Sequence, residues 1–273
     1  MFNLIDAENK IQKEEFIDLG GCNDIILRFT SENIVISLTK ENKLKVVETS
    51  NVDLKEEEKF ICKKVGNKLE ITQGERNSIV HIFKIGSFNR KIELFIPESY
   101  KENLEVNSSS GNIKINDNLN LNSVKCTQNS GNFKCEGALE VKDIDLKVSS
   151  GNINAKEILS RTYKINASSG NIHVGAILGS GDIAASSGNI ELEYKDIEDY
   201  STVKANSGNV KLSVPKGLNF EFWGECGSGD IRSSFDINYK NRHGSKATVT
   251  VGNEPHKKIT VNTGSGNINL REK

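Results

Sequence analysis

The sequence predicts an all-β protein: a single-chain parallel β-helix, or β-solenoid, with about 20 residues per coil. Three observations predict it. A Ser-Gly-(Asn/Asp)-apolar motif recurs along most of the chain, apolar and polar residues alternate on both sides of each motif glycine, and this two-residue period excludes a helix. A right-handed solenoid is expected from the usual handedness of parallel crossover connections.

The repeat sets the coil length. The motif begins at nine serines: Ser110, Ser130, Ser150, Ser169, Ser180, Ser187, Ser207, Ser228 and Ser265. Successive motif glycines lie 20, 20, 19, 11, 7, 20, 21 and 37 residues apart. The spacings of 11 and 7 indicate one coil with an extra corner at Gly181. The spacing of 37 indicates that one corner between Gly229 and Gly266 has lost its motif.

The residues around the glycine predict which side chains point inward. Two residues after it stand Ile113, Phe133, Ile153, Ile172, Ile190, Val210, Ile231 and Ile268. Five residues before it, apolar residues recur in most coils, and the residues between are mostly Lys, Asn, Glu, Ser and Thr. Each coil is therefore predicted to contribute two short strands with one face inward, and stacking of the coils buries that face.

The corner itself has a physical explanation. Glycine reaches positive φ without steric cost, so the chain can bend sharply between strands. Asn and Asp tolerate left-handed conformations, and identical Asn side chains stacked about 4.8 Å apart can hydrogen-bond from coil to coil. The predicted structural corner consists of Gly111, Asn112, Gly131, Asn132, Gly151, Asn152, Gly170, Asn171, Gly188, Asn189, Gly208, Asn209, Gly229, Asp230, Gly266 and Asn267.

Three segments are distinguished within one continuous elongated domain. Residues 1–21 form a lead-in or cap, either a short amphipathic helix or a disordered stretch. Residues 22–100 form an irregular β part in which alternating strands are separated by turns, with Gly66 and Asn67 at a hairpin tip. Residues 101–273 form the regular solenoid, with a hairpin or loop excursion over 236–256. Arg271, Glu272 and Lys273 are expected to protect an exposed last strand from pairing with another molecule.

Composition limits the classes of partner and the compartment. Lys plus Arg is 36 and Asp plus Glu is 37, a balance that argues against nucleic acid or anionic lipid. The five cysteines are odd in number, so we expect reduced core thiols, with a Cys126–Cys135 pair left open. The start of the sequence has no secretory signal, which predicts a cytoplasmic location, with the cell surface or envelope as the alternative. The sequence contains no run of 18 consecutive apolar residues, so no integral membrane segment is predicted.

No catalytic, cofactor-binding or metal-binding residue is predicted. Asp143 and Asp145 lie on one face of a strand, where a solvated surface explains them, and Asp182 and Asp230 stand in the Asn place of their corners. Trp223, the only tryptophan, could stack against a sugar ring, but packing beside its neighbours is the favoured role. The corners carry Asn in place of the stacked Asp of calcium-binding repeats, and the four histidines have no zinc spacing.

The chain resembles a bacterial family of β-solenoid domains of unknown function known as putative adhesins. The resemblance covers roughly residues 22–273. It rests on IELFIPESYKENLEVNSSSGNI, on the Ser-Gly-Asn corners, on VPKGLNF followed by GSGDI, and on the closing run KATVTVGNEPHKKITVNTGSGNINL, with Pro97 and Pro215 preceding coils. It implies a single-stranded parallel β-helix and a role at the cell surface or envelope. It supplies no catalytic residues.

The functional hypothesis is a non-enzymatic scaffold or binding protein of adhesin type. Its repeated polar faces would present many weak contacts to an unidentified protein or glycan partner. Two alternatives stay open: an intracellular or membrane-proximal accessory protein in envelope regulation, and a carbohydrate-active β-helix enzyme. A smooth polar face favours the scaffold, and a groove with clustered acids and aromatics favours the enzyme. The oligomeric state is not predicted.

Overall fold

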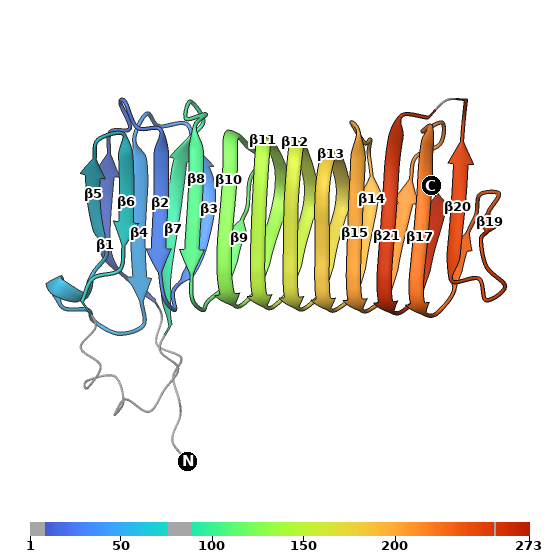
Figure 1. Cartoon of the computed structure of the whole chain (residues 1–273). Coiled ribbons are helices and arrows are strands. Elements are labelled where there is room, and N and C mark those ends of the chain that lie inside the picture. The colour runs from blue at the N-terminus through green and yellow to red at the C-terminus, as the bar shows by residue number, and fades with distance from the viewer. Residues whose placement is uncertain (1–8, 76–88, 254) are drawn as a thin grey trace, which may run out of the picture.

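The chain folds into a right-handed parallel β-solenoid, as the sequence predicts (Figure 1). The computed structural model describes residues 9–75, 89–253 and 255–273, and within these ranges 22 strands form one continuous sheet. In Figure 1 the strands that lead into the corners descend on the near side and those that follow ascend on the far side. The coils advance from left to right, which makes the path right-handed.

The middle of the stack is regular because each coil pairs with the next one along the chain. The strands β10 (Leu119–Ser130), β11 (Phe133–Ser150), β12 (Ile153–Ser169) and β13 (Ile172–Ser187) pair in parallel. Equivalent residues face each other, so that Phe133 lies beside Ile153 and Ile153 beside Ile172. Because the repeat length is fixed, equivalent apolar residues of successive coils stack on one another in the core.

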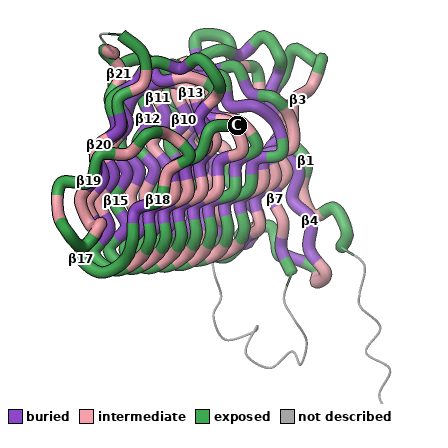
Figure 2. The backbone as a smooth tube through the Cα atoms, turned by 90° about the vertical axis from the view of Figure 1, so that its right-hand side faces the viewer, coloured by how far each residue is buried: buried purple, intermediate pink, exposed green. Residues whose placement is uncertain are grey.

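The predicted inward residues form that core. All eight residues two places after a motif glycine are buried, none more than 1% exposed. They belong to one apolar cluster running the length of the stack, and buried residues line the inside of the coils in Figure 2. Burying one such isoleucine stabilises the fold by roughly 1.5–3 kcal/mol. The apolar face of each strand therefore turns inward, and the alternation of the sequence is enough to identify the core residues.

At the N-terminal end, the first coil of the chain is not the first coil in space. Here β2 (Asp24–Phe29) and β3 (Asn33–Thr39) pair with β8 (Asn103–Ser108) and β9 (Ile113–Ile115) on one side. On the other side they pair with β6 (Lys68–Thr72) and β7 (Arg90–Pro97). The outermost positions are taken by the antiparallel strands β5 (Ile61–Val65), β4 (Leu44–Ser50) and β1 (Lys10–Ile17).

Residues 9–21, the described part of the lead-in segment, differ from both expectations, and residues 1–8 lie outside the described residues. Lys10–Ile17 is a strand paired with β4, neither a helix nor disordered. Its sequence alternates weakly and has four charges in eight residues, and an available sheet edge decides its conformation. The Glu56–Glu58 stretch forms a 3-10 turn that buries Glu58, whose carboxylate accepts the backbone N–H of Lys55.

The N-terminal end contains a buried ion cluster. The Arg90 guanidinium lies 3.3 Å from the Glu32 carboxylate and 2.5 Å from that of Glu48, and it donates to the carbonyl of Glu58. All four residues are buried. Each carboxylate also accepts backbone N–H groups, at Ser31 for Glu32 and at Phe60 for Glu48. The cluster therefore joins β4, β7 and the turn before β3.

At the C-terminal end, the last coil of the chain is again inserted. Here β21 (Lys257–Ser265) lies between β15 (Tyr200–Ser207) and β17 (Phe220–Ser228). In the same way, β22 (Ile268–Glu272) lies between β16 (Val210–Val214) and β18 (Ile231–Ser233). The strands β19 (Asn238–Tyr239) and β20 (Lys246–Val251) run antiparallel beyond β17. In Figure 1, β21 lies between β15 and β17.

The C-terminal pairings correct two expectations from the repeat, and the course of β13 corrects a third. The spacing of 37 hides no lost corner, because the residues between hold the β19–β20 excursion. The charged end at Arg271–Lys273 does not protect an exposed strand, since β22 is paired on both sides. Gly181 makes no extra corner either. It lies inside β13, and Asp182 faces Lys164 and Thr202, outside the Asn ladder. The strand β14 (Ile190–Tyr194) completes that coil.

Candidate functional site: a polar groove across the coils

The predicted corner residues form one ladder along the edge of the stack. From the Asn33 coil to the Asp230 coil, the backbone N–H of each corner residue donates to the Asn side-chain oxygen of the coil before it, at 2.8–3.0 Å. In spatial order the ladder is Asn33, Asn112, Asn132, Asn152, Asn171, Asn189, Asn209, Asn267 and Asp230. Asp230 is the last residue of the ladder, and in the part of the chain that the structure describes no corner residue of a further coil donates a hydrogen bond to its side chain.

The glycine beside each ladder residue is required by close approach of two backbones. All eight corner glycines have φ between +105° and +153°. A Cβ on Gly151 would lie 1.9 Å from the carbonyl oxygen of Gly131 in the neighbouring coil. No side chain fits there, so the ladder is a structural device, and its role is to hold coil on coil.

One rung of this ladder was missed from the sequence. Asn33 follows Ser31 and Glu32, so glutamate stands where the other coils have glycine. The signal that could have found it is Ser-x-Asn-Ile, which this coil shares with the others. The backbone carbonyl of Glu32 approaches Gly111 closely, and the Glu32 side chain turns inward to Arg90.

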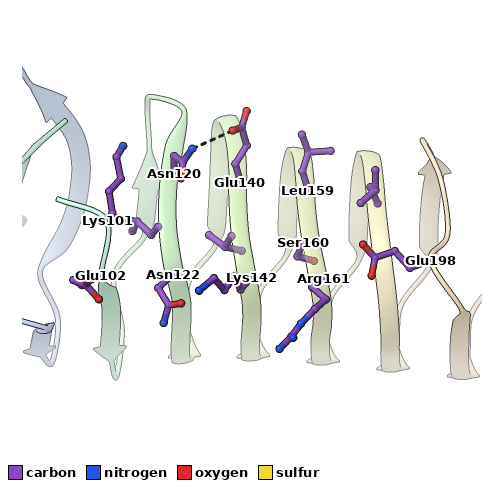
Figure 3. A pocket seen from close by; sticks show the side chains of 13 residues that line it. Lys101, Glu102, Asn120, Asn122, Glu140, Lys142, Leu159, Ser160, Arg161 and Glu198 are labelled. Carbon is purple, nitrogen blue, oxygen red and sulfur yellow. Dashed lines mark hydrogen bonds between the residues drawn. The ribbon is translucent and has the colours of Figure 1, made fainter. Parts of the chain in front are cut away.

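A shallow groove of about 650 Å³ crosses several coils of the stack (Figure 3). It extends from the turn before β8, over β10, β11, β12 and β13, to the turn before β15. Asn120, Glu140 and Leu159 are register partners and lie at one level in Figure 3. Asn122, Lys142 and Arg161 lie one level further along the strands.

The floor of the groove is apolar and its rim is charged. Leu121 and Val141 are buried, and Leu159 and Leu178 are half-buried. Around them stand the exposed side chains of Lys101, Glu102, Glu140, Lys142, Arg161 and Glu198, three cations and three acids. Such a lining can contact both the apolar and the hydrogen-bonding parts of one ligand.

Most of the charged side chains on the rim of the groove are unpaired. Within the described residues, Lys101, Glu102, Lys142 and Glu198 form no ion pair, and Arg161 reaches a carboxylate, that of Asp143, only at 3.8 Å. A rim charge without a partner keeps its hydrogen-bonding capacity for a ligand or for water.

On the opposite face the acids and bases pair with one another. Glu136 lies 2.9 Å from Lys114 and 2.8 Å from Lys134, and these two ammonium groups hold the pKa of its carboxyl below the ordinary value. Glu191 is bound by Lys211, which likewise lowers its pKa. This face therefore has less hydrogen-bonding capacity to offer a partner.

The floor also contains a buried hydroxyl. Ser160 is 3% exposed, and its Oγ has no hydrogen-bond partner among the described residues. A buried, unpartnered hydroxyl is unusual in a folded protein, and leaving a polar group unsatisfied costs about 1–3 kcal/mol. Ser160 lies between Leu159 and Arg161 along the strand and adds one polar group to the floor.

The acids considered from the sequence are engaged elsewhere. Asp143 accepts the hydroxyl of Thr162 at 2.5 Å, and Asp145 pairs with Lys147 at 3.1 Å. Both are half-buried on the outward side of β11. Among the residues the structure describes, no group of three or more His, Cys, Asp or Glu side chains could hold a metal ion.

The thiols lie in the core. All five cysteines are free, and four of them, including Cys126 and Cys135, are buried. Burial raises the pKa of Cys126 and of Cys135 to about 12. Both are protonated at neutral pH and act as small apolar residues. In the described ranges, no helix has the length and apolar character needed to cross a membrane.

Comparison with known proteins gives a family and a fold. No curated protein matches the sequence. A "putative lipid binding protein" from Parabacteroides distasonis has a similar structure, with 20% identity, a TM-score of 0.56 and 97% of each chain covered. A "putative adhesin" from Bacteroides fragilis is similar at 14% identity, with a TM-score of 0.55 and 97% of this chain and 99% of the other covered. The profile of the Toastrack DUF4097 family matches residues 22–271, and the chain therefore belongs to that family of domains of unknown function.

Proposed function

We propose that this chain is a non-catalytic binding scaffold of adhesin type, and that its groove holds a neutral glycan across successive coils. The observation that carries the proposal is the groove itself. Six unpaired or weakly paired charges of balanced sign surround an apolar floor, while on the opposite face Glu136 and Glu191 are each bound by lysine.

The balance of charge favours a neutral ligand. Lys101, Lys142 and Arg161 offset Glu102, Glu140 and Glu198, so a polyanion or a polycation would meet as much repulsion as attraction. A glycan has hydroxyl groups that both donate and accept, and its rings have apolar C–H faces. It can therefore use both the rim and a floor such as Leu121, Val141 and Leu159.

The repeat suits a polymer. Neighbouring coils lie about 4.8 Å apart, so each further coil along the groove adds another set of side chains to an extended ligand. Weak contacts repeated in this way add up, and affinity should rise with the length of the glycan. The Asn120–Glu140–Leu159 and Asn122–Lys142–Arg161 rows supply those contacts.

The test is an array of glycans and peptidoglycan fragments probed with the purified protein and with two variants. Lys142→Ala combined with Arg161→Ala should weaken binding of a selective hit at least about tenfold, equivalent to 1.4 kcal/mol. Lys134→Ala, on the opposite face, is the matched control and should bind like the parent. Longer oligomers of the same sugar should bind more tightly.

Other outcomes would contradict the proposal. A hit that survives the double variant lies outside the groove. Release of shorter sugars from a bound glycan would make the protein a carbohydrate-active enzyme. A blank array, together with a protein captured through the groove residues, would favour the accessory role in envelope regulation.

A further inference from the structure

Trp223 lies on the outer surface near the C-terminal end, where sequence reasoning favoured packing. It belongs to β17, and its side chain is 40% exposed although both neighbours, Phe222 and Gly224, are buried. Alternation along the strand explains this, since Phe222 points inward and Trp223 must point outward. An exposed indole is a large apolar surface that gains free energy when a ligand covers it.

The row of outward residues that contains Trp223 changes character along the stack. In the middle, register partners in this row are Lys125, Asp145, Lys164 and Asp182, which alternate in charge. Toward the C-terminal end the row continues as Thr202, Thr260, Trp223 and Thr248. The inserted coil and the antiparallel β20 thus place threonine hydroxyls on both sides of the indole.

Trp223 and the two threonines beside it line a recess of about 300 Å³. Beside Trp223, Thr248 and Thr260, its lining includes Thr250, Glu221 and Lys258. Glu221 and Lys258 are register partners, yet within the described part of the chain neither forms an ion pair. Tyr200, the register partner of Lys258 on β15, is a second exposed aromatic at 41%. The recess joins an aromatic surface to hydroxyls, one free carboxylate and one free ammonium.

We propose that this recess is a saccharide-binding site, separate from the groove, that takes a single pyranose ring. The C–H face of the ring lies on the Trp223 indole, and its hydroxyls bond to Thr260, Glu221 and Lys258. The ligand class follows from the lining. A purely apolar ligand would leave Glu221 and Lys258 buried without partners, and an anion would be repelled by Glu221 as much as it is attracted by Lys258.

The test uses the fact that Trp223 is the only tryptophan of the chain. Its fluorescence reports on this recess alone, so titration with chitotriose, cellotriose and maltotriose needs no label. For a sugar that binds, we expect the emission maximum to move to shorter wavelength and acrylamide quenching to fall at least twofold. Trp223→Ala should lower the affinity at least tenfold by calorimetry, and Thr260→Val, which keeps the shape and removes the hydroxyl, should lower it severalfold.

The controls separate this site from the groove. The Lys142→Ala, Arg161→Ala double variant should leave the fluorescence response unchanged, so that either site can fail without the other. Circular dichroism checks that Trp223→Ala keeps its fold, and Trp223→Phe, which retains an aromatic face, should bind more tightly than Trp223→Ala. Unchanged emission and quenching with all three sugars would overturn the proposal. So would an emission shift that depends on protein concentration alone, because the recess would then be covered by a second copy of the chain.

Discussion

The middle of the stack and its two ends are built by different rules. From β10 to β13, each coil pairs with the next coil in the sequence, and one 20-residue unit specifies both fold and register. At each end, the terminal coil of the chain lies between two other coils. The β2–β3 coil lies between β6–β7 and β8–β9. The β21–β22 coil lies between β15–β16 and β17–β18. The outermost strands are antiparallel, except for β18, which pairs in parallel with β22.

The difference shows that a regular repeat needs additional strands at both ends of the stack, because its last coil leaves backbone groups unpaired. Every coil presents unpaired N–H and C=O groups to the next, so an unmodified last coil would pair with another molecule. The antiparallel strands at the ends do not continue the parallel register. The inserted coils place the first and last strands of the regular pattern between two partners, which protects them from fraying. The ends also hold what the repeat lacks, including the Arg90 ion cluster and the Trp223 recess.

The largest expected effect comes from placing a charge inside the middle of the stack. Ile172 is 1% exposed and stacks between Ile153 and Ile190. Ile172→Asp should cost about 4 kcal/mol or more and unfold the stack, because a carboxylate there has no partner. Circular dichroism with urea denaturation measures it. The matched control is Asn154→Asp, a change to the same residue on the exposed side of a neighbouring strand. A soluble, fully folded Ile172→Asp protein would contradict the assigned inner face.

A smaller effect distinguishes a corner glycine of the middle from a hairpin glycine of the end. Gly151→Ala should cost about 3 kcal/mol, because its Cβ meets the Gly131 carbonyl oxygen at 1.9 Å and its φ is +141°. Gly66, at the β5–β6 hairpin tip, has φ +60° and nothing within 4 Å of a Cβ. Gly66→Ala should cost only about 1 kcal/mol, for the left-handed conformation alone. Equal losses in thermal or urea unfolding would mean that backbone strain, not contact between coils, makes glycine necessary.

The smallest effect concerns the order of coils at the C-terminal end. Ile268 on β22 has stacked neighbours on both sides, Val210 and Ile231, whereas Ile231 on β18 has such a neighbour only on the side of β22. Both are at most 1% exposed. Ile268→Ala should therefore destabilise by at least about 1 kcal/mol more than Ile231→Ala, since its cavity lies between two coils. The reverse ranking in urea unfolding would place the last coil at the exposed end of the stack.

The sequence predicted the core more completely than the surface. Ile113, Ile153 and Ile268 were identified as inward residues because period-two alternation and a fixed distance from glycine leave one choice. Trp223 was misjudged because a strand in which Phe222, Trp223 and Gly224 adjoin gives no clear alternation. The groove could not be found either, since Asn120, Lys142 and Arg161 come from three coils and only the stack brings them together.

The sequence by itself determined the solenoid, its coil length, its inner face and its corner, because each is a local pattern repeated at a fixed interval. Only the tertiary structure decided which coils are neighbours at the two ends, because a coil such as β21–β22 fits equally well against any coil of the same length. What selects its place is the path of the chain and the pairing left free by β15, β16, β17 and β18. The Trp223 recess follows from that placement, since it combines β17, β20 and β21. The groove follows from the stacking of successive coils in the middle.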